Sequence, residues 1–575
     1  MSTGRKLIYQ MFKRLAGKEM SCLEDDCKNP EAAQLRILRE ILKRSADTVY
    51  GREHKLASVN TIAEFRRAVP ISDYEAHRPY IDRIWNGEKN VLSTEYPSMF
   101  ATTSGTMGQA KYIPVTKSYI KEFRHASIAS GYFTLLNFPG IANGITLSVF
   151  SPAEEGRSPA GVPYGAISGG LYLREPFLVK KFISPIPYQV YLTKDYESKY
   201  YALLRCALVL PVTCFYTLNP STIVVLLKRL DQFAPALIKD IEEGSFSAPN
   251  TSDEKLKKAM KPYLKKNPQR AKELRQLLED GKFQPNHIWP LLQVVCCWTR
   301  ASAAFYIKDF PAYFGDVPIT DITYGASEGR GSISMGDGRQ LLSIRSHFYE
   351  FIPEDEIDNH SPKVLLAHEL SEGQNYYIIF TTSAGLYRYH INDVVKVVGF
   401  HHKCPLIEFQ YKGGNISSFT GEKLTELQVT NAMRAALISS KMRCRFFTVL
   451  PEFRPNPHYR ILLEPEEDDD RKKTKEQLPT LLRDFESNLF EQNIEYKAKR
   501  DSSRLDPVLG DLLKTGSYEN LRKQMTANGV ADAQIKLSHL NPKEEVRFYF
   551  INQIDDGTSD EERRPLNSIS GTHEK

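Results

Sequence analysis

Residues 102–111 read Thr-Thr-Ser-Gly-Thr-Met-Gly-Gln-Ala-Lys, a stretch of hydroxyl groups and glycine that ends in a lysine. Short apolar runs flank it, Ser98–Ala101 before and Tyr112–Thr116 after, and such runs are typical of strands. Small residues let backbone N–H groups approach phosphate oxygens closely, the hydroxyl groups add donors, and Lys111 adds a positive charge. The stretch therefore predicts a phosphate-binding turn between two strands.

Two other interpretations of this turn exist. A Walker A loop does not fit, because Gly105 and Lys111 lack the G-x4-G-K-[ST] spacing and no helix follows directly. A kinase or GTPase of that class is therefore disfavoured. A hairpin turn of Ser, Thr and Gly that binds nothing has the same composition, so the turn alone does not establish a nucleotide site.

The length and charge of the chain narrow the possible classes. A chain of 575 residues is too long for one ordinary domain, so we expect a large domain and a smaller one. The net charge is +6, from 76 basic and 70 acidic residues, and the basic residues are spread through the chain. The densest basic stretch, Lys255–Lys282, alternates with glutamates at helical spacing, which favours a solvated helix face. We therefore expect no nucleic-acid partner.

The cysteines and the N-terminus indicate the compartment. The eight cysteines include no CxxC pair and no Cys/His grouping at zinc spacing, which predicts a reducing compartment and no structural metal. Met1–Met20 carries basic residues beside apolar ones at i, i+4 spacing, which predicts a short amphipathic helix. It lacks the uninterrupted apolar core of a signal peptide, so we expect a cytoplasmic protein. A helix packed on the domain is favoured over a membrane-surface or organellar role.

Cys206–Leu227 is uncharged and long enough to suggest a membrane-spanning segment. Pro211 and the cluster Asn219–Thr222 divide it, and this cluster has the composition of a helix start. We therefore predict two short buried helices and no transmembrane segment.

The order of strand-like and helical stretches predicts the fold class. From Glu31 to about Phe400, apolar runs typical of strands alternate with helical stretches such as Ile223–Ile241 and Ala301–Phe314. The predicted strands are Ile145–Val149, Val294–Cys297, Ile319–Tyr324, Tyr376–Thr382 and Val394–Phe400. This alternation predicts an α/β protein with several buried sheets in a large N-terminal domain.

A second pattern begins after Lys412–Ser418, which carries paired glycines and loses the apolar periodicity. The expected elements are a helix at Glu422–Leu437, strands at Arg445–Leu450 and Tyr459–Glu464, a charged loop at Glu466–Lys475 and a helix at Gln477–Ile494. That order predicts a small α+β domain. The predicted divisions are a large domain at 1–411, a hinge at 412–418, a small mobile domain at 419–554 and a disordered tail at 555–575.

Two further motifs carry polar groups at the ends of predicted strands. Tyr324-Gly-Ala-Ser-Glu328 precedes Gly329–Gly331, and a glutamate beside small residues can reach a metal bound to phosphate. Gly385–Asp393 places Asp393 at the start of a strand, where it can accept hydrogen bonds from both hydroxyls of a ribose. Singly, these acids are also typical of a helix cap, a turn or a strand edge. The three motifs in this order are far more specific than any one.

Together the motifs resemble those of the auxin-responsive acyl acid-amido synthetases, a family of the adenylate-forming superfamily, in a member of non-plant type. The resemblance extends from about Arg36 to Leu540. It implies the adenylate-forming architecture, with the large domain binding nucleotide and acyl acid. The residues that it assigns to the nucleotide are Thr103, Ser104, Gly105, Thr106, Lys111, Thr323, Tyr324, Gly325, Ala326, Ser327, Glu328 and Asp393. Glu328 would also hold Mg²⁺.

Beyond the predicted hinge, Gly421–Glu426 and Gln534–Lys536 are similar to the stretches that carry the C-terminal-domain lysines of this family. The resemblance therefore implies catalytic roles for Lys423 and Lys536. Lys536 is expected near the α-phosphate during the first step, and Lys423 is the competing candidate. Because the second step needs a different set of groups, the small domain is expected to rotate about the hinge.

The implied reaction uses ATP and Mg²⁺ to convert a small carboxylic acid to its acyl-adenylate, which an amine, expected to be an amino acid, then attacks to give an amide. The sequence does not indicate which oligomeric state the protein adopts. Transfer to a thiol is one alternative. A catalytically weak nucleotide-binding descendant that acts through interactions is another, motivated by four departures from the family pattern: Met107, Arg300, His390 and Asn392. The last two stand where the family's ribose motif has arginine and glycine.

Overall fold

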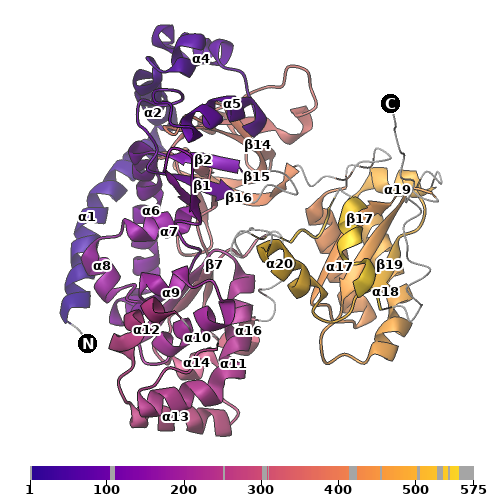
Figure 1. The fold of residues 1–575 in the computed structure, drawn as a ribbon. Helices are drawn as coiled ribbons and strands as arrows, with labels where there is room; N and C mark the ends of the chain where they lie inside the picture. Colours follow the sequence, from indigo (N-terminus) through magenta and orange to yellow (C-terminus); the bar gives the residue numbers. More distant parts are fainter. Residues whose placement is uncertain are drawn as a thin grey trace, which may run out of the picture. The chain divides into compact units, whose positions relative to one another are not determined.

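The computed structural model describes residues 3–103, 111–249, 253–300, 303, 307, 310–413, 417, 422, 424–452, 456–501, 505–527, 535, 537–541 and 544–555. The chain divides into two compact units, residues 1–410 and 411–575 (Figure 1). Residues 414–416 and 418 of the expected hinge lie outside the described residues, as do residues 556–575 of the expected tail. The hinge and the mobility of the small domain therefore stay predictions.

The stretch at 102–111 connects two paired strands, as the sequence predicts. β1 (Met99–Thr103) and β2 (Lys111–Val115) are antiparallel, in a register that runs from Met99 opposite Val115 to Thr103 opposite Lys111. The remaining strands of this mixed sheet are β5 (Pro163–Gly165) and β4 (Gly156–Arg157), in the order β2-β1-β5-β4. Residues 104–110 lie outside the described residues.

A six-stranded sheet forms the largest core of the first unit, in the order β11-β12-β16-β15-β14-β13. Its strands are β11 (Ser332–Ser334), β12 (Gln340–Leu342), β13 (Phe348–Pro353), β14 (Asn375–Thr381), β15 (Tyr389–His401) and β16 (Cys404–Lys412). Leu38 and Ile41 of α2 (Pro30–Ser45) belong to the same buried cluster as Phe348 and Phe351. The predicted strand at 394–400 is the second half of β15, so Asp393 lies inside a strand and not at its start.

A parallel sheet, in the order β3-β6-β7-β8, forms a second core of the same unit. Its strands are β3 (Ile145–Val149), β6 (Val212–Thr217), β7 (Val294–Cys297) and β8 (Ile319–Asp321). Three helices pack their apolar faces in this core: α10 (Tyr196–Ala207), α11 (Pro220–Glu243) and α13 (Pro268–Glu279).

The prediction of two helices across Cys206–Leu227 is wrong in part. α11 begins at Pro220, next to the predicted start at Asn219, but the segment before it is strand β6. A strand of a parallel sheet is buried on both faces and therefore reads as one continuous apolar run, which periodicity alone does not separate from a buried helix. None of the described helices has a stretch long and apolar enough to cross a membrane.

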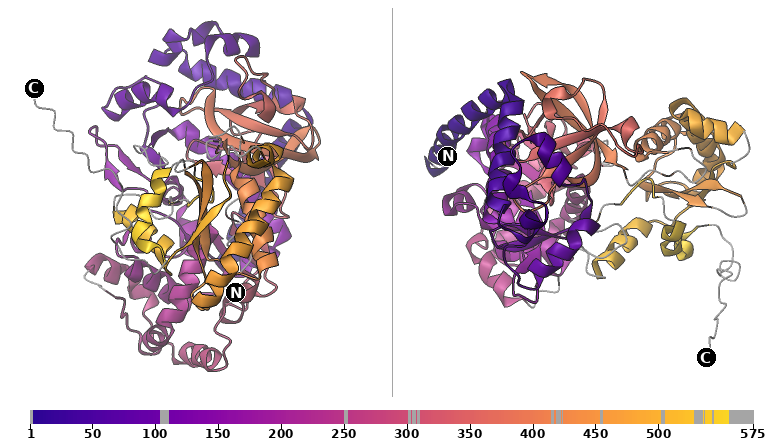
Figure 2. Two further views of the ribbon diagram at one scale, coloured as in Figure 1. Left: turned by 90° about the vertical axis from the view of Figure 1, so that its right-hand side faces the viewer. Right: turned by 90° about the horizontal axis from the view of Figure 1, so that it is seen from above.

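Further helices cover the first unit, and in both Figure 1 and Figure 2 α1 lies on its outside. α1 (Thr3–Lys28) is longer than the predicted amphipathic helix and packs on α6 (Lys117–Asn137), where the Phe12 ring lies against Gly131. The others are α3 (Val49–Glu53), α4 (Ile62–Ala68), α5 (Tyr74–Trp85), α7 (Ile167–Leu173), α8 (Phe177–Phe182), α9 (Tyr188–Leu192), α12 (Glu254–Met260), α14 (Pro285–Ile288) and α16 (Phe310–Phe314).

The second unit is built around a three-stranded sheet in the order β17-β18-β19. Its elements are α17 (Glu426–Ser440), β17 (Phe446–Glu452), β18 (His458–Glu464), α18 (Arg471–Gln492), α19 (Ile494–Asp501), β19 (Leu509–Leu512) and α20 (Ser517–Ala527). The predicted charged loop ends early, because Asp470 caps α18 by accepting hydrogen bonds from the backbone N–H groups of Lys472 and Lys473. Four of the five predicted elements here therefore have the expected type, and the loop is shorter than expected.

Candidate active site

The second predicted nucleotide motif forms a two-stranded hairpin. β9 (Gly325–Ala326) pairs with β10 (Gly329–Arg330), so that Ser327 and Glu328 make the turn. The Ser327 carbonyl accepts a hydrogen bond from the hydroxyl of Tyr119 at 2.6 Å, which anchors the turn to α6. The Glu328 side chain is buried, and in the described part of the chain it has no hydrogen-bond or ion-pair partner.

The residues that enter this hairpin are held by hydroxyl groups. The hydroxyl of Thr323 lies 3.1 Å from that of Ser130 on α6. The backbone N–H of Tyr324 donates to the Ser332 hydroxyl at 2.8 Å. A side chain at Gly331 would collide with the Tyr324 ring, because a Cβ there would lie 2.2 Å from two ring carbons. The glycine therefore makes room for this tyrosine, a function that the sequence alone did not assign.

The third predicted motif owes its shape to an irregularity in β15. Tyr377 pairs with Val394 and Ile379 pairs with His390, so a single residue of β14 faces three residues of β15. Asn392 within this bulge has φ of 67°, a left-handed conformation that asparagine tolerates better than most residues. The replacement of the family's glycine by Asn392 is therefore accommodated by the backbone.

The structure brings the second and third motifs together through one hydrogen bond. The Tyr324 hydroxyl donates to Oδ2 of Asp393 at 2.7 Å, and the Tyr324 ring stacks on Phe409 with centroids 5.3 Å apart. Burial, the charge of Asp393 and the charge of Glu328 raise the pKa of Tyr324. Burial and the same two carboxylates raise the pKa of Tyr389 as well. Both acids therefore border one group of buried tyrosines.

The first motif approaches this group through Lys111. Its Nζ lies 5.4 Å from the ring centroid of Tyr74, and the Tyr74 hydroxyl accepts a hydrogen bond from the backbone N–H of Tyr112 at 2.8 Å. The charge of Tyr74 also contributes, after burial and Glu328, to the raised pKa of Tyr389. Lys111, Glu328 and Asp393 thus all lie beside these tyrosines.

Arg300, one of the departures from the family pattern, is held by two ion pairs. Its guanidinium contacts Asp321 at 3.1 Å and Glu408 at 2.8 Å, and it also donates to the Gly338 carbonyl at 3.1 Å. The side chain is therefore fixed by acceptors of the protein itself. Sequence reasoning noted the arginine but had no signal for its partners, because Glu408 lies on a distant strand.

Arg330 is a further cation that sequence reasoning missed. Its guanidinium lies over the Phe123 ring, with Cζ 4.7 Å from the centroid, and burial lowers its pKa. A Cβ at Gly325 would lie only 3.2 Å from its Nη1, so the side chain lies along the hairpin. Nε is buried without a hydrogen-bond partner, and no carboxylate in the described part of the chain pairs with this arginine. Its place two residues after Glu328 was the only available signal.

The described residues fit a nucleotide and a divalent cation. Glu328 has low exposure and no partner among the described residues, so its carboxylate is available to a cation. Several predicted site residues are not available for this test, namely Ser104, Gly105, Thr106, Lys423, Lys536 and the side chain of Thr103, which lie outside the described residues. For Gly325 and Ala326, the paired backbone of the hairpin is the observed feature.

Comparison with known proteins gives concordant matches along the chain. Three family models match: the GH3 family N-terminal domain at residues 19–319, the GH3 family central domain at 340–412 and the GH3 family C-terminal domain at 427–545. The indole-3-acetic acid-amido synthetase GH3.3 of Arabidopsis thaliana is 25% identical over 552 residues, which cover 90% of this chain and 91% of that protein.

Two more proteins are similar to this chain. The jasmonoyl–L-amino acid synthetase JAR6 of Nicotiana attenuata is 27% identical over 466 residues, covering 77% of this chain and 80% of that protein. The solved structure of the GH3.15 acyl acid amido synthetase superposes with a TM-score of 0.80 at 22% identity, covering 93% of this chain and 96% of that one. This last likeness shows a shared fold.

Proposed function

Since the chain belongs to the GH3 family, we propose that it is an ATP-dependent acyl acid-amido synthetase, a ligase that activates a carboxylic acid and transfers the acyl group to an amine. Membership of the family confirms the resemblance carried by the three motifs. The relatives described above are named for amides of indole-3-acetic acid and of jasmonic acid. By analogy, a small carboxylic acid and an amino acid are the substrate classes proposed for this chain.

The observation that carries the proposal is the convergence of the motifs on one group of tyrosines. Tyr324 donates a hydrogen bond to Asp393, and this carboxylate is proposed to accept the ribose hydroxyls of ATP. Glu328 supplies a second, unpaired carboxylate from the adjacent hairpin. Mg²⁺, held there by Glu328 and phosphate oxygens, would neutralise phosphate charge. No ordinary structural role accounts for a buried, unpaired glutamate in this place.

In the first half-reaction, a carboxylate oxygen of the acid attacks the α-phosphorus of ATP and the bond to pyrophosphate breaks. The turn of Ser104 to Thr106 and Lys111 are proposed to donate to the phosphates. In the second half-reaction the amine attacks the acyl carbon, AMP leaves, and the amine loses a proton. The protein's task in both steps is to position the reactants and to stabilise charge.

Arg330 is proposed to bind the carboxylate of the acid before it reacts. The guanidinium comes from the same hairpin as Glu328, and in the described structure it has no acidic partner. Guanidinium and carboxylate groups match in geometry, and such pairs are bidentate. Phe123 beneath the guanidinium fixes its orientation. Arg330→Met is expected to raise the KM for the acid with little change in the affinity for ATP.

The C-terminal lysines are proposed to act from the small domain, which would rotate about the hinge near Lys412 between the two steps. Lys536→Ala is expected to slow the first half-reaction by orders of magnitude while sparing attack on a supplied acyl-adenylate. An equal loss in both halves would point to a shared binding role, and no loss would move the role to Lys423.

Pyrophosphate exchange tests the proposed function directly. The protein is incubated with ATP, Mg²⁺, labelled pyrophosphate and a panel of aliphatic and aromatic carboxylic acids. At least one acid should support exchange, and adding amino acids should then give amide. Exchange with thiol acceptors but not amines would change the assignment to thioester formation. ATP binding in calorimetry without exchange for any acid would support the catalytically weak descendant instead.

Two structural observations favour an active enzyme over that descendant. Asn392 adopts the backbone conformation that its position requires, and Arg300 is held by Asp321 and Glu408.

We also assign the protein to the cytoplasm, since all eight cysteines are free thiols, as is usual in reducing compartments.

A further inference from the structure

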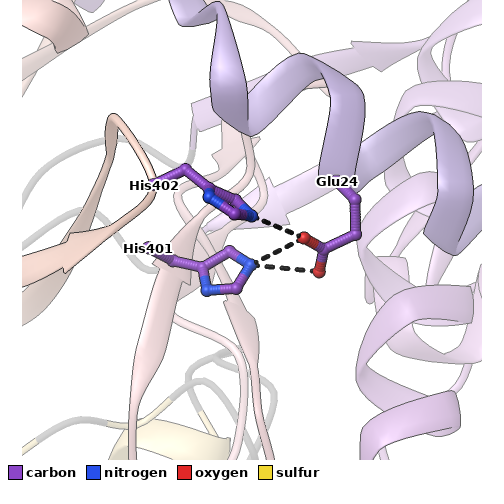
Figure 3. Close-up of side chains that lie close together, drawn as sticks. All are labelled: Glu24, His401 and His402. Atoms are coloured by element: carbon purple, nitrogen blue, oxygen red, sulfur yellow. Dashed lines mark hydrogen bonds and ion pairs between the residues drawn. The ribbon is translucent and has the colours of Figure 1, made fainter.

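We propose that Glu24, His401 and His402 form a binding site for a divalent transition-metal ion such as Zn²⁺. The three side chains converge in the first unit, where the last turns of α1 meet the hairpin between β15 and β16 (Figure 3). None of them belongs to the nucleotide motifs, and the cysteine pattern gave no indication of a metal. The proposal is independent of the proposed ligase function.

The geometry already matches a metal site. Nε2 of His401 lies 3.0 Å from both carboxylate oxygens of Glu24, and Nε2 of His402 lies 3.0 Å from one of them. Ligand atoms bound to tetrahedral Zn²⁺ at 2.0–2.2 Å are about 3.3 Å from one another. The ligand atoms of all three residues lie within 4.8 Å of one another, a range from which side-chain rotation can bring them onto one metal ion. Two imidazoles and one carboxylate are a donor set that such ions favour.

The backbone of the hairpin is shaped to present both imidazoles on one side. His402 and Lys403 form its two-residue turn, and His402 has φ of 53°. Two-residue turns with positive φ at the first position favour asparagine, aspartate or glycine there, and histidine is also enriched in this conformation. Consecutive strand residues point to opposite faces, whereas here the two rings lie together, with centroids 4.6 Å apart. The turn therefore brings two potential ligands to one side of the hairpin.

The hairpin and the helix are also fixed to each other by the main chain. The backbone N–H of Lys403 donates to the carbonyl of Cys27, one turn beyond Glu24, at 3.0 Å. This bond sets the histidines opposite the glutamate without help from the side chains. The site is therefore preorganised, which reduces the ordering needed when a ligand binds.

A plain ion pair is the competing explanation, and the neighbouring contacts of α1 argue against it. Glu19 and Asp26 on the same helix both pair with Arg345, a residue that is always charged, and Glu19 also contacts Nδ1 of His125 at 2.9 Å. Glu24 instead meets two groups that become metal ligands when they are neutral.

The side chains leave room for water on the metal. Their exposed fractions are 38% for Glu24, 27% for His401 and 42% for His402. Three protein ligands with an open position are typical of zinc sites that bind water or a further ligand. In the described part of the chain, no hydrogen-bond partner holds the Nδ1 atom of either histidine. Since such partners usually strengthen binding by about 10–100-fold, we expect a weaker site than a buried structural zinc.

The test is calorimetric titration of the full chain, stripped with EDTA, with ZnCl₂. One equivalent of Zn²⁺ should bind, with release of protons. Zn²⁺ should also raise the Tm, because it binds the folded state. His402→Asn is the sharpest variant, since asparagine keeps the left-handed backbone while removing the ligand. Glu24→Gln is a second, isosteric variant. Both should weaken binding by more than about 10-fold and abolish the rise in Tm.

The matched control is His360→Asn, at an exposed histidine outside the cluster, which should bind Zn²⁺ like the unaltered protein. Bound Co²⁺ offers a second readout, because its visible absorption should appear with the unaltered protein and be absent with His402→Asn. The proposal would be overturned if the unaltered protein bound Zn²⁺ no more tightly than the two site variants. A loss of metal-free stability in Glu24→Gln with no Zn²⁺ effect on any form would identify an ion pair only.

Discussion

Two buried glutamates of the first unit, Glu350 and Glu328, differ completely in their surroundings. Glu350 on β13 is 1% exposed. Its carboxylate accepts hydrogen bonds from Nε of Arg388 at 2.7 Å and from Nε of Arg66 at 2.8 Å. Glu328 is 6% exposed and has no partner in the described part of the chain. Burial is similar, so burial alone does not say what either carboxylate is for.

The two glutamates differ in the source of the positive charge that compensates their carboxylates. The desolvation cost of Glu350 is offset within the fold, by two arginines that also donate to main-chain carbonyls or hold a neighbouring helix. Glu328 has no such partner among the described residues, which suits a group that binds a cation brought by a ligand. We therefore expect Glu350 to stabilise the fold and Glu328 to take part in the reaction, and substitutions should separate the two roles.

Glu350→Gln is expected to have the largest effect. It leaves Arg388 buried with an uncompensated charge, and breaking a buried pair in this way costs about 3–5 kcal/mol. Urea denaturation measures the loss of stability in the first unit. Glu372→Gln, at an exposed glutamate, is the matched control and should change stability by less than about 0.5 kcal/mol. Equal stability of the two variants would show that the ion pair contributes nothing net.

Glu328→Gln should give the opposite pattern. No hydrogen bond or ion pair among the described residues is lost with it, so the Tm should change little. Pyrophosphate exchange should fall by about 100-fold, or about 2.7 kcal/mol, and need more Mg²⁺, because a charged oxygen ligand is lost. A lower Tm with normal exchange would mean that this glutamate is structural after all.

The sequence predicts a feature of this site well when the residues that form it are close together in the chain, and poorly when they are far apart. Local composition was enough for the strands on either side of residues 102–111. The compensation of Glu350 was not predictable, because its two arginines lie far from it in the chain. The difference between it and Glu328 exists only in the tertiary structure.

The fold shows the same limit. The bulge that carries Asn392 depends on the pairing of β14 with β15. The apolar sequence of Val212–Thr217 fits a buried helix as well as a strand, and only the pairing with parallel neighbours identifies the strand. The cluster of Glu24 with His401 and His402 joins residues that no spacing rule connects. Sequence patterns therefore predicted types of element well and long-range partners poorly.

Asp393→Ala extends the comparison to a third carboxylate. Its partner is the hydroxyl of Tyr324 within the site, where Glu350 has two arginines. Losing charged hydrogen bonds to the ribose should weaken ATP binding by roughly 2–3 kcal/mol while the protein stays folded. Calorimetry with ATP measures this. Tyr324→Phe should cost only about 1 kcal/mol, since it removes one hydrogen bond and keeps the carboxylate. Unchanged affinity in a folded Asp393→Ala protein would remove the ribose assignment.

The smallest expected effect concerns Glu175, which follows α7 and, like Glu328, has no ion pair among the described residues. Its Oε2 is buried without a hydrogen-bond partner, and burial raises its pKa from the ordinary 4.5 to about 7, although Lys180 acts in the opposite direction. Below the ordinary value both the folded and the unfolded chain carry the proton, so the side chain costs nothing. As the pH rises toward 7 only the unfolded chain releases its proton, which lowers the free energy of unfolding until the folded form also ionises. Glu175→Gln should therefore match the unaltered protein near pH 4.5 and exceed its stability above pH 7, by about 1 kcal/mol after allowance for solvent screening of a half-buried group. Denaturation curves across this range measure the difference, with Glu372→Gln as a control that should show no such trend. A Glu175→Gln curve parallel to that of the unaltered protein at every pH would mean that solvent reaches this carboxylate and that its position costs no stability.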